Sequence, residues 1–69
     1  MNKTGYIVTV WYGDGEYFEE FFSCEDTADN YARHTMLSGL ITYHGNIKFF
    51  YPPHKINYIT LQEKQYEES

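Results

Sequence analysis

The sequence predicts an α+β fold, in which an antiparallel sheet of four to five strands carries one α-helix on one face. Three observations lead to this prediction. Two aromatic and β-branched runs flank the turn Gly13-Asp14-Gly15, a helical spacing of apolar residues follows over 24–38, and short strand-like runs fill 40–61. The expected order is strand, strand, helix, then two or three strands. With 69 residues and no repeat or linker, the chain is expected to form one domain over residues 1–69.

The stretch from Tyr6 to Phe22 is predicted to form one long β-hairpin. Glycine supplies the positive φ that a tight turn needs, and the loop is either the two-residue Asp14-Gly15 type or a three-residue loop over 13–15. Both faces of the two strands carry aromatic side chains. One helix covers only one face of a sheet, so the second face needs more of the chain or a partner. We therefore expect a homodimer.

A helix is predicted from Cys24 to Ser38, because its apolar residues recur at intervals of three and four. Ser23 is the expected N-cap, with an acidic residue three positions later as in a capping box. Asp29 and Arg33 are spaced to form an i, i+4 ion pair on the outer surface.

Two further strands are predicted over Leu40–His44 and Ile47–Tyr51, joined by a tight turn at Gly45-Asn46. Two prolines end the second of these strands. A last strand is expected over Ile56–Leu61, and the polar residues 62–69 are predicted to be a frayed tail.

The charge of the chain is unevenly distributed. The formal net charge is −5, and seven of the ten acidic residues lie between positions 14 and 29, where no basic residue occurs. A nucleic-acid backbone is bound by clustered Lys and Arg, so direct nucleic-acid binding is not expected. No apolar run approaches the ~18 residues that span a bilayer, so no membrane insertion is expected. The single cysteine and the absence of a signal peptide indicate a cytoplasmic protein.

Four residues that commonly bind zinc occur at intervals of ten: Cys24, His34, His44 and His54. Structural zinc sites place their ligands in pairs about two to five residues apart, so one turn presents both. A uniform interval of ten offers no such pair, and neither a metal nor a cofactor is predicted.

Catalysis is not predicted either. The Cys24 thiol lies at the expected start of the helix, but the neighbouring carboxylates of Glu25 and Asp26 oppose a thiolate, so a packed, unreactive cysteine is expected. The sequence also lacks a nucleophile elbow and a phosphate-binding loop. The chain is therefore predicted not to be an enzyme.

Carboxylates and large aromatic side chains are interleaved along the hairpin. Such a surface suits a basic patch of another protein, because aromatic residues supply contact area while charge supplies steering and specificity. The predicted partner-binding residues are Trp11, Tyr12, Asp14, Glu16, Glu19 and Glu20.

The short chain, the aromatic hairpin from Tyr6 to Phe22 and the acidic run from Asp14 to Asp29 resemble small phage or mobile-element accessory proteins, anti-CRISPR and other anti-defence proteins among them. The resemblance implies a non-enzymatic inhibitor in the host cytosol, with acidic side chains in place of phosphates on a basic surface of a host nuclease. Two alternatives are a small-ligand binder that holds a nucleotide in an aromatic pocket between subunits, and a structural or assembly protein.

Overall fold

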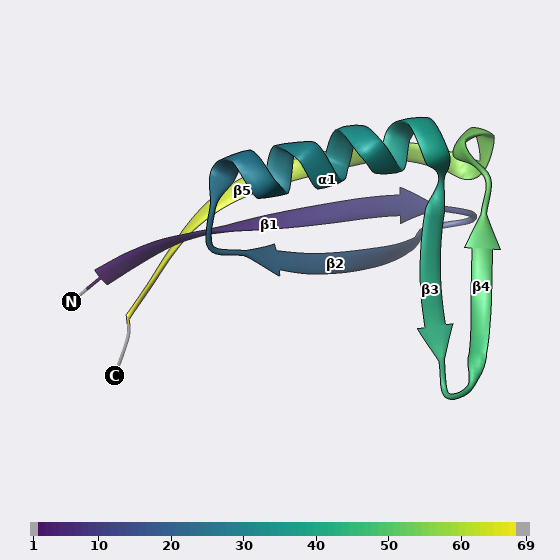
Figure 1. Cartoon of the computed structure of the whole chain (residues 1–69), viewed down its shortest axis with the longest axis horizontal. Coiled ribbons are helices and arrows are strands. Elements are labelled where there is room, and N and C mark those ends of the chain that lie inside the picture. The colour runs from purple at the N-terminus through teal and green to yellow at the C-terminus, as the bar shows by residue number, and fades with distance from the viewer. Residues whose placement is uncertain (1, 68–69) are drawn as a thin grey trace.

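The computed structural model describes residues 2–67 and contains one α-helix, one short 3₁₀ turn and five strands (Figure 1). In chain order the elements are β1 (Asn2–Tyr12), β2 (Glu16–Phe22), α1 (Glu25–Ser38), β3 (Leu40–His44), β4 (Ile47–Tyr51), the 3₁₀ turn η1 (Pro53–Lys55) and β5 (Ile56–Glu67). The predicted α+β class and the predicted order of elements are confirmed. The strands, however, lie in two separate sheets rather than one.

The main sheet has three antiparallel strands in the order β2-β1-β5, with β1 in the centre. The pairing of β1 with β2 runs from Tyr6 opposite Phe22 to Tyr12 opposite Glu16. The turn is therefore the three-residue loop over 13–15, in which Gly13 and Gly15 have φ values of 61° and 85°.

Strand β5 is twice as long as its sequence pattern suggested. It pairs with β1 over the whole length of that strand, from Tyr12 opposite Ile56 to Asn2 opposite Glu67. The prediction of a frayed tail is therefore wrong for residues 62–67, while residues 68–69 lie outside the described residues. Residues 2–5 also belong to β1, because the end of β5 supplies their strand partner.

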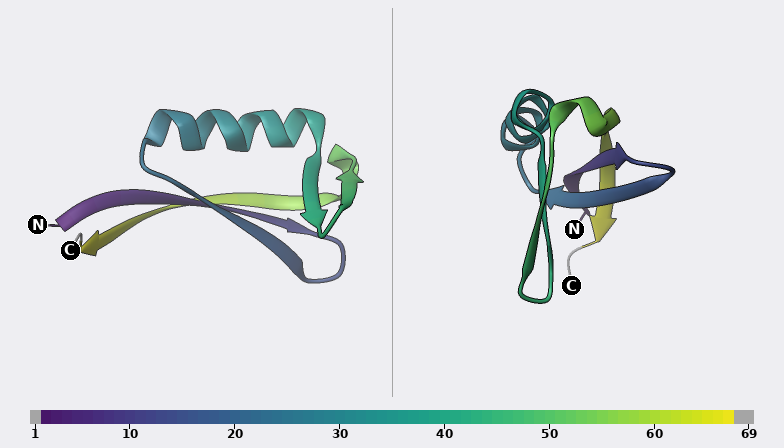
Figure 2. Two further views of the ribbon diagram at one scale, coloured as in Figure 1. Left: turned by 60° about the horizontal axis from the view of Figure 1, so that its bottom comes forward. Right: turned by 90° about the vertical axis from the view of Figure 1, so that its right-hand side faces the viewer.

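The helix α1 lies across one face of the main sheet (Figures 1 and 2). Its N-cap is Cys24 rather than Ser23, and no side chain caps it, so the predicted capping box is wrong. The predicted pair is present, with Arg33 Nε 2.6 Å from Asp29 Oδ2. Within residues 2–67, no helix is both long enough and apolar enough to cross a membrane.

The core lies between α1 and the sheet. Four apolar side chains are buried there, Val8 and Val10 from β1, Ala28 from α1 and Leu40 from β3. Alternate residues of a strand point to opposite faces, so the even-numbered residues of β1 face the helix. The odd-numbered residues of β1 therefore face away from the helix, on a side of the sheet that no element of the described chain covers (Figure 2). We call this side the open face.

Strands β3 and β4 form a two-stranded hairpin over residues 40–51, which we call the arm. The arm leaves the end of α1 and projects away from the body of the molecule (Figures 1 and 2). Both edges of β1 are already paired, so the arm has no place beside the central strand. Its direction is set at Gly39, where φ is 95° and ψ is 179° and the backbone N–H donates to Thr35 O at 2.8 Å.

Candidate functional site

The six predicted partner-binding residues lie on the β1–β2 hairpin but do not form one surface. Trp11 and Glu19 lie on the open face, Tyr12, Glu16 and Glu20 lie on the helix side, and Asp14 lies in the turn. The alternation of side chains along a strand causes this division, because positions 11 and 12, or 19 and 20, point in opposite directions. The predicted set therefore contributes to two distinct surfaces.

The first surface is a row of three aromatic rings across the open face. The register places Tyr17 of β2 and Tyr58 of β5 on either side of Trp11 of β1. The ring centroids of Tyr17 and Trp11 are 5.0 Å apart, and those of Trp11 and Tyr58 are 5.7 Å apart and stacked. Tyr17 and Tyr58 remain 55% and 52% exposed. We call this set the aromatic row.

Packing alone holds the central ring of the row in place. The indole Nε1 of Trp11 is buried, and no acceptor within the described residues accepts a hydrogen bond from it. A buried donor without an acceptor costs free energy, which the contacts of the indole with both tyrosine rings offset.

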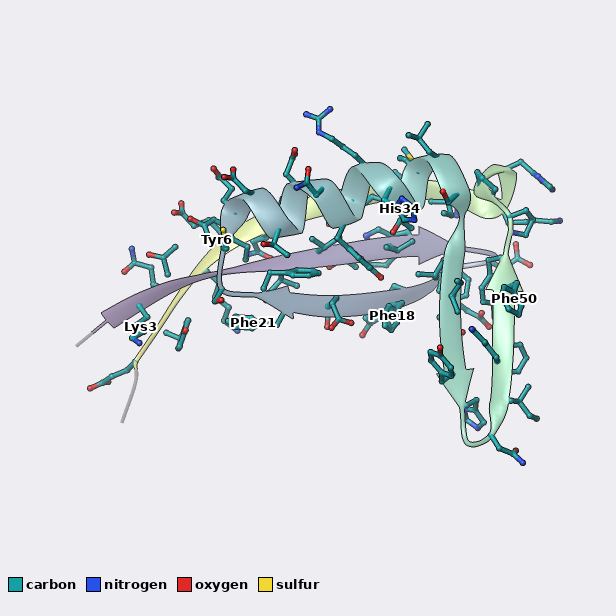
Figure 3. The ribbon with its side chains drawn as sticks, viewed as in Figure 1. Lys3, Tyr6, Phe18, Phe21, His34 and Phe50 are labelled. Carbon is teal, nitrogen blue, oxygen red and sulfur yellow. The ribbon has the colours of Figure 1, made fainter. Side chains whose placement is uncertain are left out.

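Charge is divided along the open face. Glu19 lies on the same face as the aromatic row, next to Thr9 and Thr60 in the neighbouring register position. Lys3 and Lys64 lie on the same face near its far end, where β1 starts and β5 finishes (Figure 3 labels Lys3). The row is therefore at the acidic end of the open face.

The second surface is a groove between the arm and the helix side of β2. It consists of two adjoining open hollows of about 440 Å³ and 510 Å³, which share Phe18, Thr42 and Tyr43. Among residues 2–67, Glu20 of β2 is the only carboxylate that lines either hollow. We call this space the aromatic groove, and its aromatic lining residues include Phe18, Phe22, Tyr31, Tyr43, Phe49 and Tyr51.

Two tyrosine hydroxyls in this groove hold their protons more tightly than usual. Burial raises the pKa of Tyr12, and the neighbouring Tyr51 and Glu16 raise it further. Burial likewise raises the pKa of Tyr31, with Glu20 adding to the effect. Both hydroxyls are therefore protonated at neutral pH and can donate hydrogen bonds to a bound group.

The third surface is the arm itself, which is apolar on both faces. Tyr43 and Phe50 on one face are 70% and 67% exposed, and Ile47 on the other face is 55% exposed. Lys48 Nζ lies 5.5 Å and 5.3 Å from the ring centroids of Tyr43 and Phe50. An exposed apolar surface of this kind is typical of interaction sites.

Cys24 is exposed, so the prediction of a packed cysteine is wrong. The backbone amides of Thr27 and Asp26 and the hydroxyl of Thr27 lower the pKa of the Cys24 thiol, although the Asp26 carboxylate acts against this shift. Cys24 is the N-cap residue, so its thiol lies near the free amides at the start of the helix, although it makes no capping hydrogen bond. His34, ten residues further along α1, is about 15 Å away along the helix axis, too far to act as a base for the thiol.

We predict that Cys24 reacts with iodoacetamide at a lower pH than a free cysteine does, because the folded helix start stabilises its thiolate. The midpoint of the alkylation rate against pH should move further down in Asp26→Asn and up in Thr27→Val. In ~8 M urea the shift should vanish. A native midpoint equal to that in urea would show that the helix amides do not act on the thiol.

The four residues considered as zinc ligands lie on different elements or at different positions along one element. Cys24 caps α1, His34 lies within that helix, His44 ends β3 and His54 lies in η1. Within residues 2–67 no three His, Cys, Asp or Glu side chains lie close enough together to hold a metal ion.

Sequence reasoning missed Tyr58 and the aromatic groove. Tyr58 joins the row only through the register of β5 with β1, which a single sequence does not specify. The groove was not predicted because the arm was expected to extend the main sheet. Residues 40–51 contain no acidic residue and are apolar at both odd and even positions. A strand pair that is apolar on both faces and has no helix to cover it was the signal in the sequence for an apolar surface here.

Comparison of the chain with protein-family models, with curated proteins and with solved structures finds no match.

Proposed function

We propose that this chain is a small, non-enzymatic protein-binding module that docks its aromatic row on a basic patch of a nucleic-acid enzyme, such as a CRISPR or other defence nuclease, and inhibits it. One observation carries the proposal. Three aromatic rings pack side by side in register on a sheet face that no element within residues 2–67 covers, and two of them are about half exposed. We place this module in the cytoplasm, where such an enzyme works.

The aromatic row has the properties of a contact centre for a protein partner. Tyrosine and tryptophan are enriched among residues that dominate binding energy, because each ring offers a large area at a small cost in side-chain entropy. Trp11 is already packed between its two neighbours, so little ordering is needed on binding. The backbone of three paired strands holds the rings in place.

The carboxylates next to the row favour a basic partner. Glu19 shares its face, Asp14 lies in the turn at the same end of the hairpin, and Glu16 borders that turn from the helix side. Negative side chains in this arrangement attract the Lys and Arg that an enzyme uses for nucleic-acid phosphates, and they increase the rate of encounter. Occupation of that patch would block the nucleic acid without any chemistry by this chain.

The proposal is tested by immobilising the chain, capturing proteins from a host lysate and titrating the purified captured protein. We expect the affinity to fall at least about tenfold between ~50 mM and ~500 mM salt, because charge contributes to the contact. The captured protein should also lose binding to its labelled nucleic acid as the chain is added. Affinity that is unchanged by salt would contradict the role of the carboxylates.

Variants locate the surface. Tyr17→Ala with Tyr58→Ala should weaken capture by about 100-fold, as expected for residues at a contact centre. Glu16→Gln with Glu19→Gln should reduce the salt dependence. The matched control is Glu63→Gln with Glu67→Gln, which removes the same charge from the helix side of β5 and should leave capture unchanged. Equal losses in both charge pairs would indicate a general effect of net charge.

The aromatic groove favours one second candidate, a small planar ligand such as a nucleotide. Its hollows of about 440 Å³ and 510 Å³ fall within the range of ligand sites, and aromatic rings dominate the lining. Ultraviolet-absorbing material released when the purified protein is denatured would support this candidate. Protein that releases none, and that binds no added nucleotide, would exclude it.

A further inference from the structure

We propose that the chain forms a two-fold symmetric dimer, in which the arm of each copy packs into the aromatic groove of the other. This inference concerns a different surface from the aromatic row, and it does not depend on the proposed function. It rests on the composition of the arm, the composition of the groove, their charges and the total surface of the chain.

The arm makes few packing contacts with the body of its own chain. A two-stranded hairpin is marginally stable in water unless it packs against something else. Only the base of the arm reaches the core, through buried Leu40 and half-buried Tyr51. Beyond the base, both faces expose large apolar side chains, and the ribbon extends into solvent (Figure 2). A partner that covers both faces of the arm therefore removes most of this exposed apolar surface.

The aromatic groove offers a matching surface on the same chain. Phe18, Phe22 and Tyr31 line it from the body, and Ile41, Thr42 and Tyr43 line it from the arm. Phe18 lies at the end of the molecule from which the arm projects (Figure 3). Arm and groove lie beside each other, so a two-fold axis next to the groove brings each arm to the other groove. Such a reciprocal contact closes on itself and stops at two copies.

The charges of the two surfaces are complementary. Residues 40–51 contain Lys48 and His44 but no acidic residue. Glu20 lines the groove, and it belongs to the acidic segment over 14–29. An arm that enters the groove therefore brings its lysine toward a carboxylate, whereas an acidic segment would be repelled.

The surface area of the chain agrees with a missing partner. The accessible surface is 5,288 Å² for a chain of 8.2 kDa. A compact monomer of this mass exposes about 4,500 Å². The excess of roughly 750 Å² is close to the ~800 Å² that each partner buries in an interface of standard size. The projecting arm contributes to this excess, as do the paired ends of β1 and β5 that extend beyond the helix (Figure 1).

Analytical ultracentrifugation of the full chain over a range of concentrations tests the dimer. We expect twice the 8.2 kDa chain mass at micromolar concentration. Tyr43→Ser with Phe50→Ser should raise the dimer dissociation constant by about 100-fold or more. The matched control is Tyr17→Ser with Tyr58→Ser, which removes two comparably exposed aromatic rings from the open face and should leave the dimer intact. Circular dichroism checks that each variant is folded.

A charge test addresses the groove without removing apolar contacts. Glu20→Lys should weaken the dimer at least tenfold, while Glu19→Lys, its neighbour on the opposite face, should not. Lys48→Glu should weaken the dimer as well, and the double variant Glu20→Lys with Lys48→Glu should recover part of the loss. All dimer affinities are compared at one salt concentration, because salt screens the charges that these variants change.

Three results would overturn the inference. They are a chain that stays monomeric at tens of micromolar, a dimer that is unaffected by the arm variants, and a dimer that is lost only in the open-face variants. If the chain stays monomeric and binds added nucleotide in the groove, the groove is a ligand site rather than a dimer contact. Because the open-face variants test partner capture and the arm variants test self-association, failure of one proposal leaves the other intact.

Discussion

Replacing Gly39 by alanine is expected to destabilise the protein by about 3 kcal/mol or more. The residue has φ 95° and ψ 179°, a combination that is essentially restricted to glycine. An added Cβ would also overlap the carbonyl oxygen of Tyr51 and lie 3.3 Å from Cα of Pro52, so the backbone at the base of the arm would have to move. A chain of 69 residues has a stability of about 3 to 10 kcal/mol, and the variant would lose a large part of it.

Thermal unfolding measures this effect. A loss of about 3 kcal/mol lowers the melting temperature of a domain of this size by roughly 12 to 24 °C. Gly45→Ala is the control, because φ is 66° there but an added Cβ meets nothing within 4 Å. It should cost only about 1 to 2 kcal/mol. Equal losses for both variants would mean that the close approach of Gly39 to Tyr51 contributes nothing.

The fold class was predictable because each element has a local signal. Gly13 and Gly15 mark the first turn, and the spacing of apolar residues in α1 defines a helix of nearly the observed length. The predicted strands over 40–44 and 47–51 have the bounds that the structure shows. These signals act over a few residues, so they are readable without knowing the tertiary contacts.

The second half of β5 was not predictable in the same way. Residues 62–67 are mostly polar, which is typical of an exposed tail, yet they form an edge of the sheet where polar side chains are exposed on both faces. Their pairing with residues 2–7 is the longest-range contact along the chain. Nothing local encodes a pairing between the two ends of a sequence.

The candidate site was predicted in its composition but not in its geometry. The acidic-aromatic character of the hairpin is visible in the sequence, whereas the division of the six residues between two faces depends on the register. Trp11 contributes to the aromatic row and Tyr12 to the groove, although they are neighbours in sequence. The one helix covers one face of the sheet, as expected, and the other face remains open.

The arm exposes apolar surface that the sequence did not predict. The two apolar faces of the first hairpin predict a partner, and the open face of that hairpin does carry exposed aromatic residues. A larger apolar exposure lies on residues 40–51, which no helix covers. The open face carries carboxylates and the arm carries none, so the two apolar surfaces differ in charge and suit the two different partners proposed above.

Removing residues 62–69 is expected to destabilise the protein by about 3 kcal/mol, because β1 loses its strand partner over residues 2–7. Among the described strands, β2 pairs with β1 only from Tyr6 onward, so the strand partner of residues 2–5 is β5. The ring of Tyr66 is also lost, which packs edge-on against Phe21 with centroids 5.6 Å apart and covers Gly5. Chemical denaturation should show a lower midpoint, whereas a frayed tail would be removed without effect.

Proline substitutions test the same pairing in the full-length chain. Proline lacks the N–H that a ladder needs, and neighbouring residues of a strand point their N–H groups to opposite edges. β5 is an edge strand, so only one of Glu63→Pro and Lys64→Pro removes a hydrogen bond to β1. That variant should lose at least about 1 kcal/mol more than the other. Two proline variants as stable as the unsubstituted chain would show that residues 62–67 do not pair with β1 in solution.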